Sequence, residues 1–285
     1  MNDRPVYQDA LHTTLESIKP LGERVQVNLM EAIDLVLAAS IHTDRDLPPF
    51  NRSAMDGYAF RASSWRQTMP VHATIAAGQR YEDDTPVDAC VEIATGAAVP
   101  ELLDVVVPHE HTDRGNPVTF DFADAPPIGG CIHARGADAA KGDVVVQAGT
   151  VMGAVEVGLA ALVGVTAVEV HRRPRVAIFT SGDELVNDSV APGPHQIRNS
   201  NGPMVQATVE RCGGDVVHRS NLPDTRNAVH SAIEAILPEV DLIVTTGGIS
   251  AGRADYIPDA MELLGCRWLV SGVRMQPGKP VRTGR

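Results

Sequence analysis

The sequence predicts an α/β protein of several domains: an N-terminal helical segment, a β-rich middle domain and a parallel-sheet α/β domain. Three observations support this prediction. The chain has 285 residues, more than one domain usually holds. Between residues 70 and 149, short β-like runs alternate with turn residues. From Arg175 onward, strand-like and helix-like segments alternate, which is typical of a parallel sheet covered on both faces.

The composition excludes several classes of protein. There are 36 acidic residues against 24 Lys and Arg, a net charge of −12, which argues against partners such as nucleic acid or an anionic membrane surface. No run of about 18 apolar residues is present, and no secretory signal opens the chain. The four cysteines have no CxxC spacing, so a zinc knuckle is unsupported. We therefore expect a cytoplasmic protein with reduced thiols.

The N-terminal segment is expected to be helical. Residues 1–22 predict a short helix with an exposed lead. Apolar residues recur at helical spacing from Leu29 to Ala39, which predicts a second helix there. Asn28 stands at the N-cap position and Glu31 follows three residues later, close to a capping box.

The β-rich middle domain follows a Pro-rich stretch. Its expected strands are Val71 to Ile75, Cys90 to Ala94, Val105 to Val107, Val118 to Phe122, and Val144 to Val146. A helix from Ala154 to Leu162 and a linker, HRRPR (171–175), come next. We expect four parts: 1–45, the helical part of domain I; 46–140, β-rich; 141–173, the second part of domain I with the linker; and 174–285, the α/β domain.

The last part alternates strands and helices. The expected strands are Val176 to Thr180, Val216 to Arg219, Leu242 to Thr246 and WLVSGV (268–273). The expected helices run from Asn201 to just before Gly213, from Thr225 to Leu237 with Asp224 as the cap, and through Met261 to a stop at Gly265.

Ligands of parallel sheets bind beyond the carboxyl ends of the strands, and two such ends are visible. Ser181-Gly182-Asp183-Glu184 follows the first strand, and Gly247 to Tyr256 follows the third. Glycine backbone favours an anion, and the carboxylates Asp183, Glu184 and Asp255 suit a hard cation. The pattern favours a phosphorylated substrate with Mg²⁺. The alternative is a plain strand-to-helix turn with Asp183 as a helix cap.

Other residues leave two interpretations open. Lys279, in a Pro-Gly loop after Arg274, suits phosphate but also a solvated turn. Asp56 and Asp138, like Thr95-Gly96, lie among small residues where a ligand approaches or a turn caps itself.

Three other motif patterns would point to different functions. His109 and His111 would share one face of a strand as a metal pair, but no third ligand is evident nearby. A Walker NTPase is rejected because Arg253-Ala254 replace the required Lys-Ser/Thr. A dinucleotide fingerprint is missing as well.

Five motifs, in order along nearly the whole chain, resemble the MoeA family of molybdopterin molybdotransferases. They are PPFNRSAMDGYAF (48–60), RVAIFTSGDELV (175–186), IRNSNGPMV (197–205), TTGGISAGRADY (245–256) and MQPGKP (275–280). The resemblance implies Mg²⁺-dependent insertion of molybdate into adenylylated molybdopterin, with release of AMP. It also implies an elongated homodimer whose active cleft lies between the parallel-sheet domain and the partner's β-rich domain. Molybdopterin adenylyltransferase and molybdoenzymes are the expected protein partners.

The resemblance also assigns roles to individual residues. The catalytic residues it implies are Asp56, Asp138, Glu184, Asp241 and Asp255, of which Asp56, Glu184 and Asp255 would bind the metal. The substrate-binding residues it implies are Thr95, Gly96, Ser181, Gly182, Gly247, Gly248, Ser250, Gly252, Arg274 and Lys279. Local positive charge is expected to outweigh the net charge of −12 where anionic molybdate binds.

Two departures from the family pattern qualify these implications. Arg253 stands where many members carry an acidic residue or none. The chain also ends at Arg285, where members usually continue with an L-P-G-N-P-type segment and a further β-rich domain. A non-catalytic truncated paralogue or scaffold that retains molybdopterin binding or dimerisation is therefore the alternative. A phosphohydrolase of other specificity is a third hypothesis.

Overall fold

The computed structural model describes residues 4–82, 84–187, 189–223, 225–249 and 255–285. It separates into two compact units. Unit 1 consists of Met1–Val27, Asp34–Ala38 and Glu169–Arg285, and unit 2 of Asn28–Ile33 and Ala39–Val168. The chain thus enters and leaves unit 2 more than once. The four-part division expected from the sequence stays a prediction.

A three-stranded parallel sheet forms the centre of unit 1. Its strands are β14 (Arg175–Ser181), β17 (Asp215–Leu222) and β18 (Leu242–Thr246), in the order β17-β14-β18. Thr180 pairs with Thr246 on one side of β14, and Ser181 pairs with Leu222 on the other. The carboxyl ends of all three strands therefore meet at one edge. This confirms the parallel sheet that the sequence predicts.

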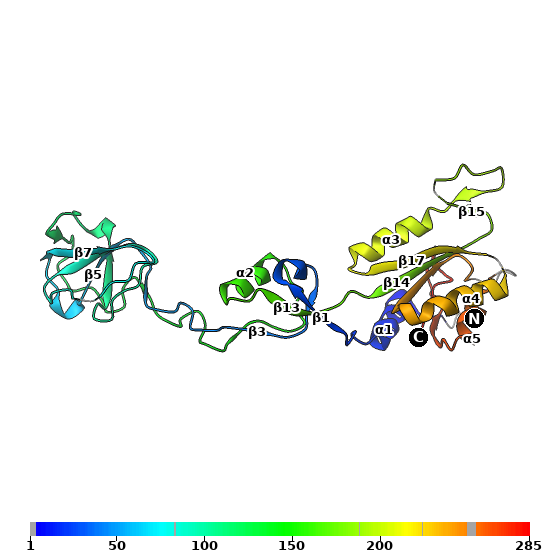
Figure 1. Cartoon of the computed structure of the whole chain (residues 1–285), viewed down its shortest axis with the longest axis horizontal. Coiled ribbons are helices and arrows are strands. Elements are labelled where there is room, and N and C mark those ends of the chain that lie inside the picture. Colours follow the sequence, from blue (N-terminus) through cyan, green and yellow to red (C-terminus); the bar gives the residue numbers. More distant parts are fainter. Residues whose placement is uncertain (1–3, 83, 188, 224, 250–254) are drawn as a thin grey trace. The chain divides into compact units, whose positions relative to one another are not determined.

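Helices cover both faces of this sheet (Figure 1). Helix α3 (Asn201–Arg211) lies along one face, and α4 (Arg226–Ile236) and α5 (Ile257–Leu263) lie on the other. Ala177 and Phe179 of β14 are fully buried in one cluster with Ile233 of α4 and Ile257 of α5. The alternate residues of β14 are equally buried, because this central strand is covered on both faces of the sheet.

Smaller elements complete unit 1. Strands β1 (Arg24–Asn28), β13 (Ala167–His171) and β2 (Val36–Leu37) form a sheet in the order β1-β13-β2. Strands β15 (Leu185–Val186) and β16 (Ile197–Arg198) pair in parallel, and a 3-10 turn, η4 (Leu237–Glu239), follows α4. Helix α1 (Tyr7–Ser17) packs on the hairpin of β19 (Trp268–Ser271) and β20 (Arg282–Gly284). Thr14 and Thr283 share a hydrogen bond of 2.9 Å across this contact.

Unit 2 is built mainly of strands. Its largest sheet has the order β7-β8-β5-β9, from β7 (Val71–Ile75), β8 (Cys90–Ile93), β5 (Gly57–Phe60) and β9 (Val105–Pro108). One side of β5 buries Tyr58 and Phe60 in an aromatic cluster, and the other buries Ala59 among aliphatic side chains. This alternation places a core on each face. This confirms that the middle of the chain is strand-rich, as the sequence predicts.

Three two-stranded ladders extend unit 2. They pair β10 (Val118–Thr119) with β6 (Thr68–Met69), β11 (Ile132–His133) with β4 (Arg52–Ser53), and β12 (Val144–Val146) with β3 (Ile41–His42). Helix α2 (Ala154–Leu162) packs on the 3-10 turn η1 (Leu29–Ala32). Two more 3-10 turns are η2 (Ala62–Ser64) and η3 (His109–His111). No helix among the described residues is long and apolar enough to cross a membrane.

The predicted helix from Leu29 to Ala39 is wrong. The Asn28 cap and its Glu31 partner form the expected capping box, but only one 3-10 turn follows them. Asp34 then takes a left-handed conformation (φ 64°), and Leu37 pairs with Val170 of β13 as a strand. Burial of Leu37 in the sheet outweighs the helical spacing, since propensity is a weak local preference.

Candidate functional site

The carboxyl edge of the parallel sheet brings together three predicted substrate-binding residues. Gly247 and Gly248 fold back on Ser181, the last residue of β14. A Cβ atom on Gly247 would lie 2.5 Å from the Ser181 carbonyl oxygen, and one on Gly248 would lie 2.8 Å from Ser181 Oγ. Both glycines also have positive φ, at 85° and 61°. Only glycine fits this close approach, which leaves bare backbone at the edge.

A chain of side-chain hydrogen bonds that the motifs do not predict supports the same edge. Asn199 donates to Thr180 Oγ1 at 2.8 Å, and Thr180 donates to Asn221 Oδ1 at 2.9 Å. Asn221 then donates to the Gly182 carbonyl at 3.1 Å. Asn199 lies in the IRNSNGPMV motif, so that motif was the available signal, whereas nothing in the sequence singles out Asn221.

Glu184 projects from the turn that this network holds. Gly182 has a φ of 144°, and a Cβ atom placed on it would lie 2.6 Å from Glu184 Oε2, so the carboxylate folds over the glycine. Glu184 is exposed, and no cationic side chain of the described residues lies within ion-pair distance of it. A carboxylate without a counter-charge beside bare backbone suits a ligand that carries its own cation.

Asp255 lies close to the start of α5, two residues before its first residue, Ile257. It follows residues 250–254, so the predicted site residues Ser250 and Gly252 lie outside the described residues, as does Arg253. Asp255 has an interaction within the chain. Its predicted role as a metal ligand stays a prediction.

The structure does not bring Asp241 to this edge. Asp241 directly precedes β18 and so lies at the amino end of the sheet, opposite Glu184. Arg172 donates to both of its carboxylate oxygens, at 2.6 and 2.9 Å, and the Arg175 backbone N–H donates to it at 2.7 Å. These bonds lower the pKa of Asp241 to about 2, and the hydrogen bonds from Arg172 have the largest effect. Asp241 therefore forms a structural ion pair with Arg172.

Arg274 and Lys279 lie in the exposed loop between β19 and β20. The Arg274 backbone N–H donates to the Pro5 carbonyl at 2.9 Å, and the Lys279 carbonyl accepts from Val273 at 3.1 Å. Their backbones are held while their side chains are exposed. Among the described residues, no hydrogen bond or ion pair joins either side chain to Ser181 or Gly247. Their phosphate-binding role stays a prediction.

Unit 2 brings together a second group of predicted residues. The Thr95 backbone N–H donates to Asp56 Oδ1 at 2.7 Å, and Gly96, with φ 82°, donates to the Ser53 carbonyl at 2.9 Å. The pKa of Asp56 lies below its usual value. The hydrogen bond from the Thr95 backbone has the largest effect, and the Thr95 hydroxyl and the charge of His109 add smaller ones. Asp56 is thus held as a carboxylate.

Asp138 lies in the same unit, at the end of the turn that follows β11. Its Oδ1 lies 2.9 Å from His133 Nε2, and its backbone N–H donates to the Leu47 carbonyl at 2.9 Å. His133 is paired with Arg52 across the β11–β4 ladder. Asp56 and Asp138 therefore both belong to the end of unit 2 built around β4.

The expectation that His109 and His111 share a strand face is wrong. Both lie in the 3-10 turn η3, where residues two apart face different directions. His109 Nε2 lies 3.4 Å from Glu92 Oε1, whereas His111 Nδ1 lies 3.4 Å from Asp121. Within the described residues, no group of three His, Cys, Asp or Glu side chains could hold a metal ion.

Two known protein families match this chain, one over each part of its length. Residues 6–164 match the MoeA N-terminal region (domain I and II), and residues 177–285 match a "Probable molybdopterin binding domain". The chain belongs to the MoeA family. The recognised motifs lie on both matched regions, so the resemblance seen in the sequence is confirmed.

Individual relatives agree with this assignment. A molybdopterin molybdenumtransferase of Haemophilus influenzae is 32% identical over 91% of this chain, and one of Bacillus subtilis is 34% identical over 90%. The molybdopterin biosynthesis MoeA protein of Pyrococcus horikoshii matches 99% of this chain with a TM-score of 0.84 and 26% identity. This chain spans 64% and 62% of the first two relatives, and 72% of the archaeal protein.

Proposed function

We propose that this MoeA-family chain inserts molybdate into adenylylated molybdopterin and releases AMP. The observation that carries the proposal is the carboxyl edge of the parallel sheet. There the Gly247-Gly248 backbone packs on Ser181, beside Glu184, which has no cation partner among the described residues. Bare backbone suits phosphate oxygens, and an uncompensated carboxylate would suit a cation that neutralises phosphate charge.

Hydrolysis of the adenylate needs a phosphate-binding turn, positive charge and a proton acceptor from the protein. The Gly247-Gly248 turn and Ser181 would hold the pterin phosphate, with Arg274 and Lys279 adding positive charge. Water would attack the adenylyl phosphorus and form a new P–O bond there. The bond from this phosphorus to the bridging oxygen breaks, so AMP leaves and the pterin phosphate keeps that oxygen. Asp138 is our proposed acceptor of the proton lost by that water. Molybdate would enter as a second substrate: its molybdenum forms two bonds to the dithiolene sulfurs, and one molybdate oxygen leaves as water with the two thiol protons.

The donor set fits Mg²⁺. Glu184 and Asp255 would supply the hard oxygen ligands that Mg²⁺ prefers, and this ion needs only one or two carboxylates when a substrate supplies phosphate oxygens. Such an ion would neutralise charge on the phosphoanhydride. Asp56 belongs to unit 2, and its role as a third ligand stays a prediction.

The deciding experiment measures AMP release by the purified chain from adenylylated molybdopterin, with Mg²⁺, in the presence and absence of molybdate. Molybdate-dependent release supports the transferase. Release that ignores molybdate would favour a phosphohydrolase of other specificity. Absence of release with pterin binding retained would overturn the proposal in favour of a scaffold.

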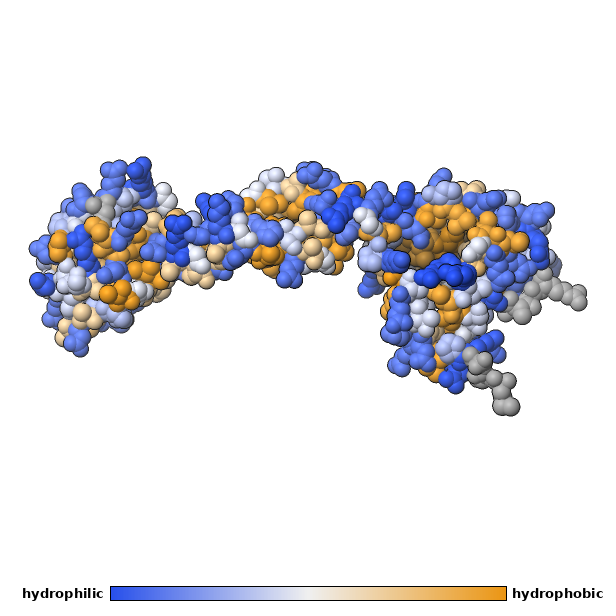
Figure 2. Space-filling model, turned by 90° about the horizontal axis from the view of Figure 1, so that it is seen from below, coloured by the Kyte–Doolittle hydropathy of each residue, from blue (hydrophilic) through white to orange (hydrophobic). Residues whose placement is uncertain are grey.

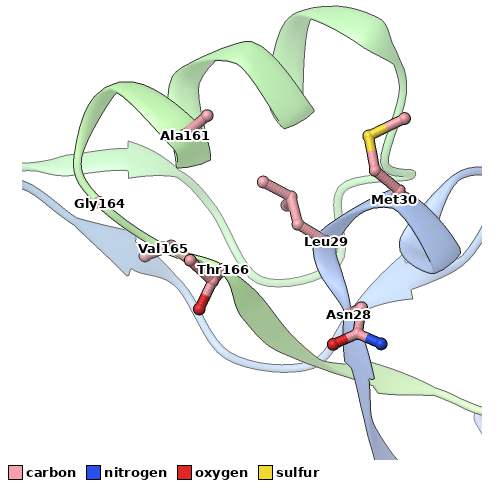
Figure 3. Close-up of a pocket in the computed structure, with 7 residues that line it drawn as sticks. All are labelled: Asn28, Leu29, Met30, Ala161, Gly164, Val165 and Thr166. Carbon is pink, nitrogen blue, oxygen red and sulfur yellow. The ribbon is translucent and has the colours of Figure 1, made fainter.

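We further propose that the chain forms a homodimer through an apolar surface of unit 2. A groove of about 340 Å³ lies between η1 and α2, lined by Leu29, Met30, Ala161 and Val165 among others (Figure 3). Hydrophobic residues gather on the surface of this part of unit 2 (Figure 2). Met30 and Val155 are 68% and 69% exposed, and Leu162 lies two helical turns from Val155. Such an apolar surface is typical of an interface.

The dimer is tested by analytical ultracentrifugation. The double variant Val155→Asp/Leu162→Asp places two charges on α2 and should convert the dimer into a monomer. Leu102→Asp, on an equally exposed residue elsewhere in unit 2, serves as the control. A dimer that persists in the double variant would refute this interface. Cytoplasmic location and binding to molybdopterin adenylyltransferase or molybdoenzymes stay predictions.

A further inference from the structure

Three side chains of unit 2 form a hydrogen-bonded row. Arg52 Nη2 lies 3.1 Å from His133 Nδ1, and His133 Nε2 lies 2.9 Å from Asp138 Oδ1. Arg52 and His133 stand opposite each other in the β4–β11 ladder, so the backbone fixes their spacing. Among the described histidines, His133 alone has hydrogen bonds on both ring nitrogens.

This row determines which ring nitrogen of His133 carries the proton. A guanidinium group only donates hydrogen bonds, so His133 Nδ1 must accept and carries no proton. Nε2 is then protonated and donates to Asp138. The ring is held as the Nε2–H tautomer between a guanidinium group and a carboxylate.

The turn that carries Asp138 fixes the other end of the row. Gly136 takes a left-handed conformation (φ 72°) and donates to the Pro48 carbonyl at 3.0 Å. The Asp138 backbone N–H is bound by Leu47, as described above. His133 therefore occupies Oδ1, and among the described residues no partner holds Oδ2. One carboxylate oxygen is anchored while the other is available to a substrate or water.

We propose that His133 is a positioning residue for Asp138, and that Arg52 sets its tautomer. The proposal rests on the proposed function, because Asp138 is there the acceptor of the water proton. His133 aims Oδ2 by holding Oδ1 and never touches the substrate itself. Side chains that orient metal-binding residues change activity by about 10- to 100-fold when they are removed, and we expect an effect of that order for His133.

The tautomer is tested without any activity assay. Nitrogen-15 NMR of the full chain at about pH 8, above the ordinary histidine pKa, should show His133 with a protonated Nε2 and an unprotonated Nδ1. Arg52→Met should let the ring exchange between both tautomers. The reverse tautomer, or a mixture in the unmodified chain, would overturn the proposal.

The positioning role is tested by turnover. His133→Leu should lower kcat for AMP release at least about tenfold with little change in KM, because the lost contact matters in the transition state. His133→Gln keeps an N–H donor and should recover much of that rate. His111→Leu removes a comparable His–Asp pair, with Asp121, and should leave turnover unchanged.

The outcomes separate the two proposals. If Asp138→Asn lowers turnover while His133→Leu does not, His133 has no positioning role. If the unmodified chain releases no AMP, the proposed function fails, and the nitrogen spectrum still decides whether the row exists.

Discussion

The two ends of strand β14 use a carboxylate in opposite ways. At the amino end, Asp241 is paired with Arg172 and with the Arg175 backbone N–H, and its side chain is only 18% exposed. At the carboxyl end, Glu184 is exposed and has no cation partner among the described residues. The first carboxylate is fully satisfied by the fold, and the second has no counter-charge among the described residues. Carboxylates in one domain therefore differ in role according to what surrounds them.

Each end is organised to suit this difference. Arg172 also pairs with Glu23, so the amino end joins the start of unit 1 to the sheet through charge. The carboxyl end uses neutral groups, namely the Gly247-Gly248 backbone and the Thr180, Asn199 and Asn221 network. Neutral donors shape the edge without neutralising Glu184. We therefore expect substitutions of the carboxylate at the carboxyl end to lower activity, and substitutions of the carboxylate at the amino end to lower stability.

The largest effect is expected from Glu184→Gln. The substitution removes the charge but keeps the shape, so turnover should fall about 100-fold or more, as when one electrostatic group is lost from a reacting centre. Stability should change by no more than about 0.5 kcal/mol, because the side chain is exposed. AMP release and urea denaturation measure the two effects. Glu234→Gln, on the exposed face of α4, is the matched control. Unchanged turnover in Glu184→Gln would remove Glu184 from the site.

Gly247→Ala tests whether the carboxyl edge needs bare backbone. The new Cβ would meet the Ser181 carbonyl oxygen at 2.5 Å in a residue with φ 85°, so we expect a loss of about 2–4 kcal/mol of stability together with turnover. Gly265→Ala is the control, since Gly265 has φ 94° but open space around it. It should lose only about 1 kcal/mol. Equal losses in both variants would show that the close approach to Ser181 is unimportant.

Asp241→Asn tests the amino end. Its folded pKa of about 2 lies below the unfolded value of 3.8, so the pair stabilises the protein above about pH 4 and this contribution is lost as the pH falls toward 2. The shift corresponds to roughly 2 kcal/mol at neutral pH. The variant should be less stable at neutral pH by about that amount, in urea denaturation, and its stability should vary less between pH 4 and 2. Its turnover should be normal while it is folded. A folded, stable Asp241→Asn variant without turnover would contradict the structural role of Asp241.

Local patterns predicted much of this molecule. The parallel strands and the turns after them were predicted because apolar runs, glycines and helix stops lie close together in sequence. The helix from Leu29 to Ala39 failed because its apolar spacing fits a helix, while Leu37 gains more by pairing with Val170, far along the chain. Asn221 was not found because its role depends on Thr180, a neighbour only across the sheet.

The sequence by itself determined the family, the parallel sheet and the position of the glycine turn at its carboxyl edge, because these follow from motifs and from residues near one another in the chain. The tertiary structure alone decided which carboxylates are satisfied. Asp241 meets Arg172, 69 residues away in the chain, only after the fold has formed, and Glu184 meets no cation of the described residues. The sequence gives the charge of each side chain, but the fold determines which partner neutralises it.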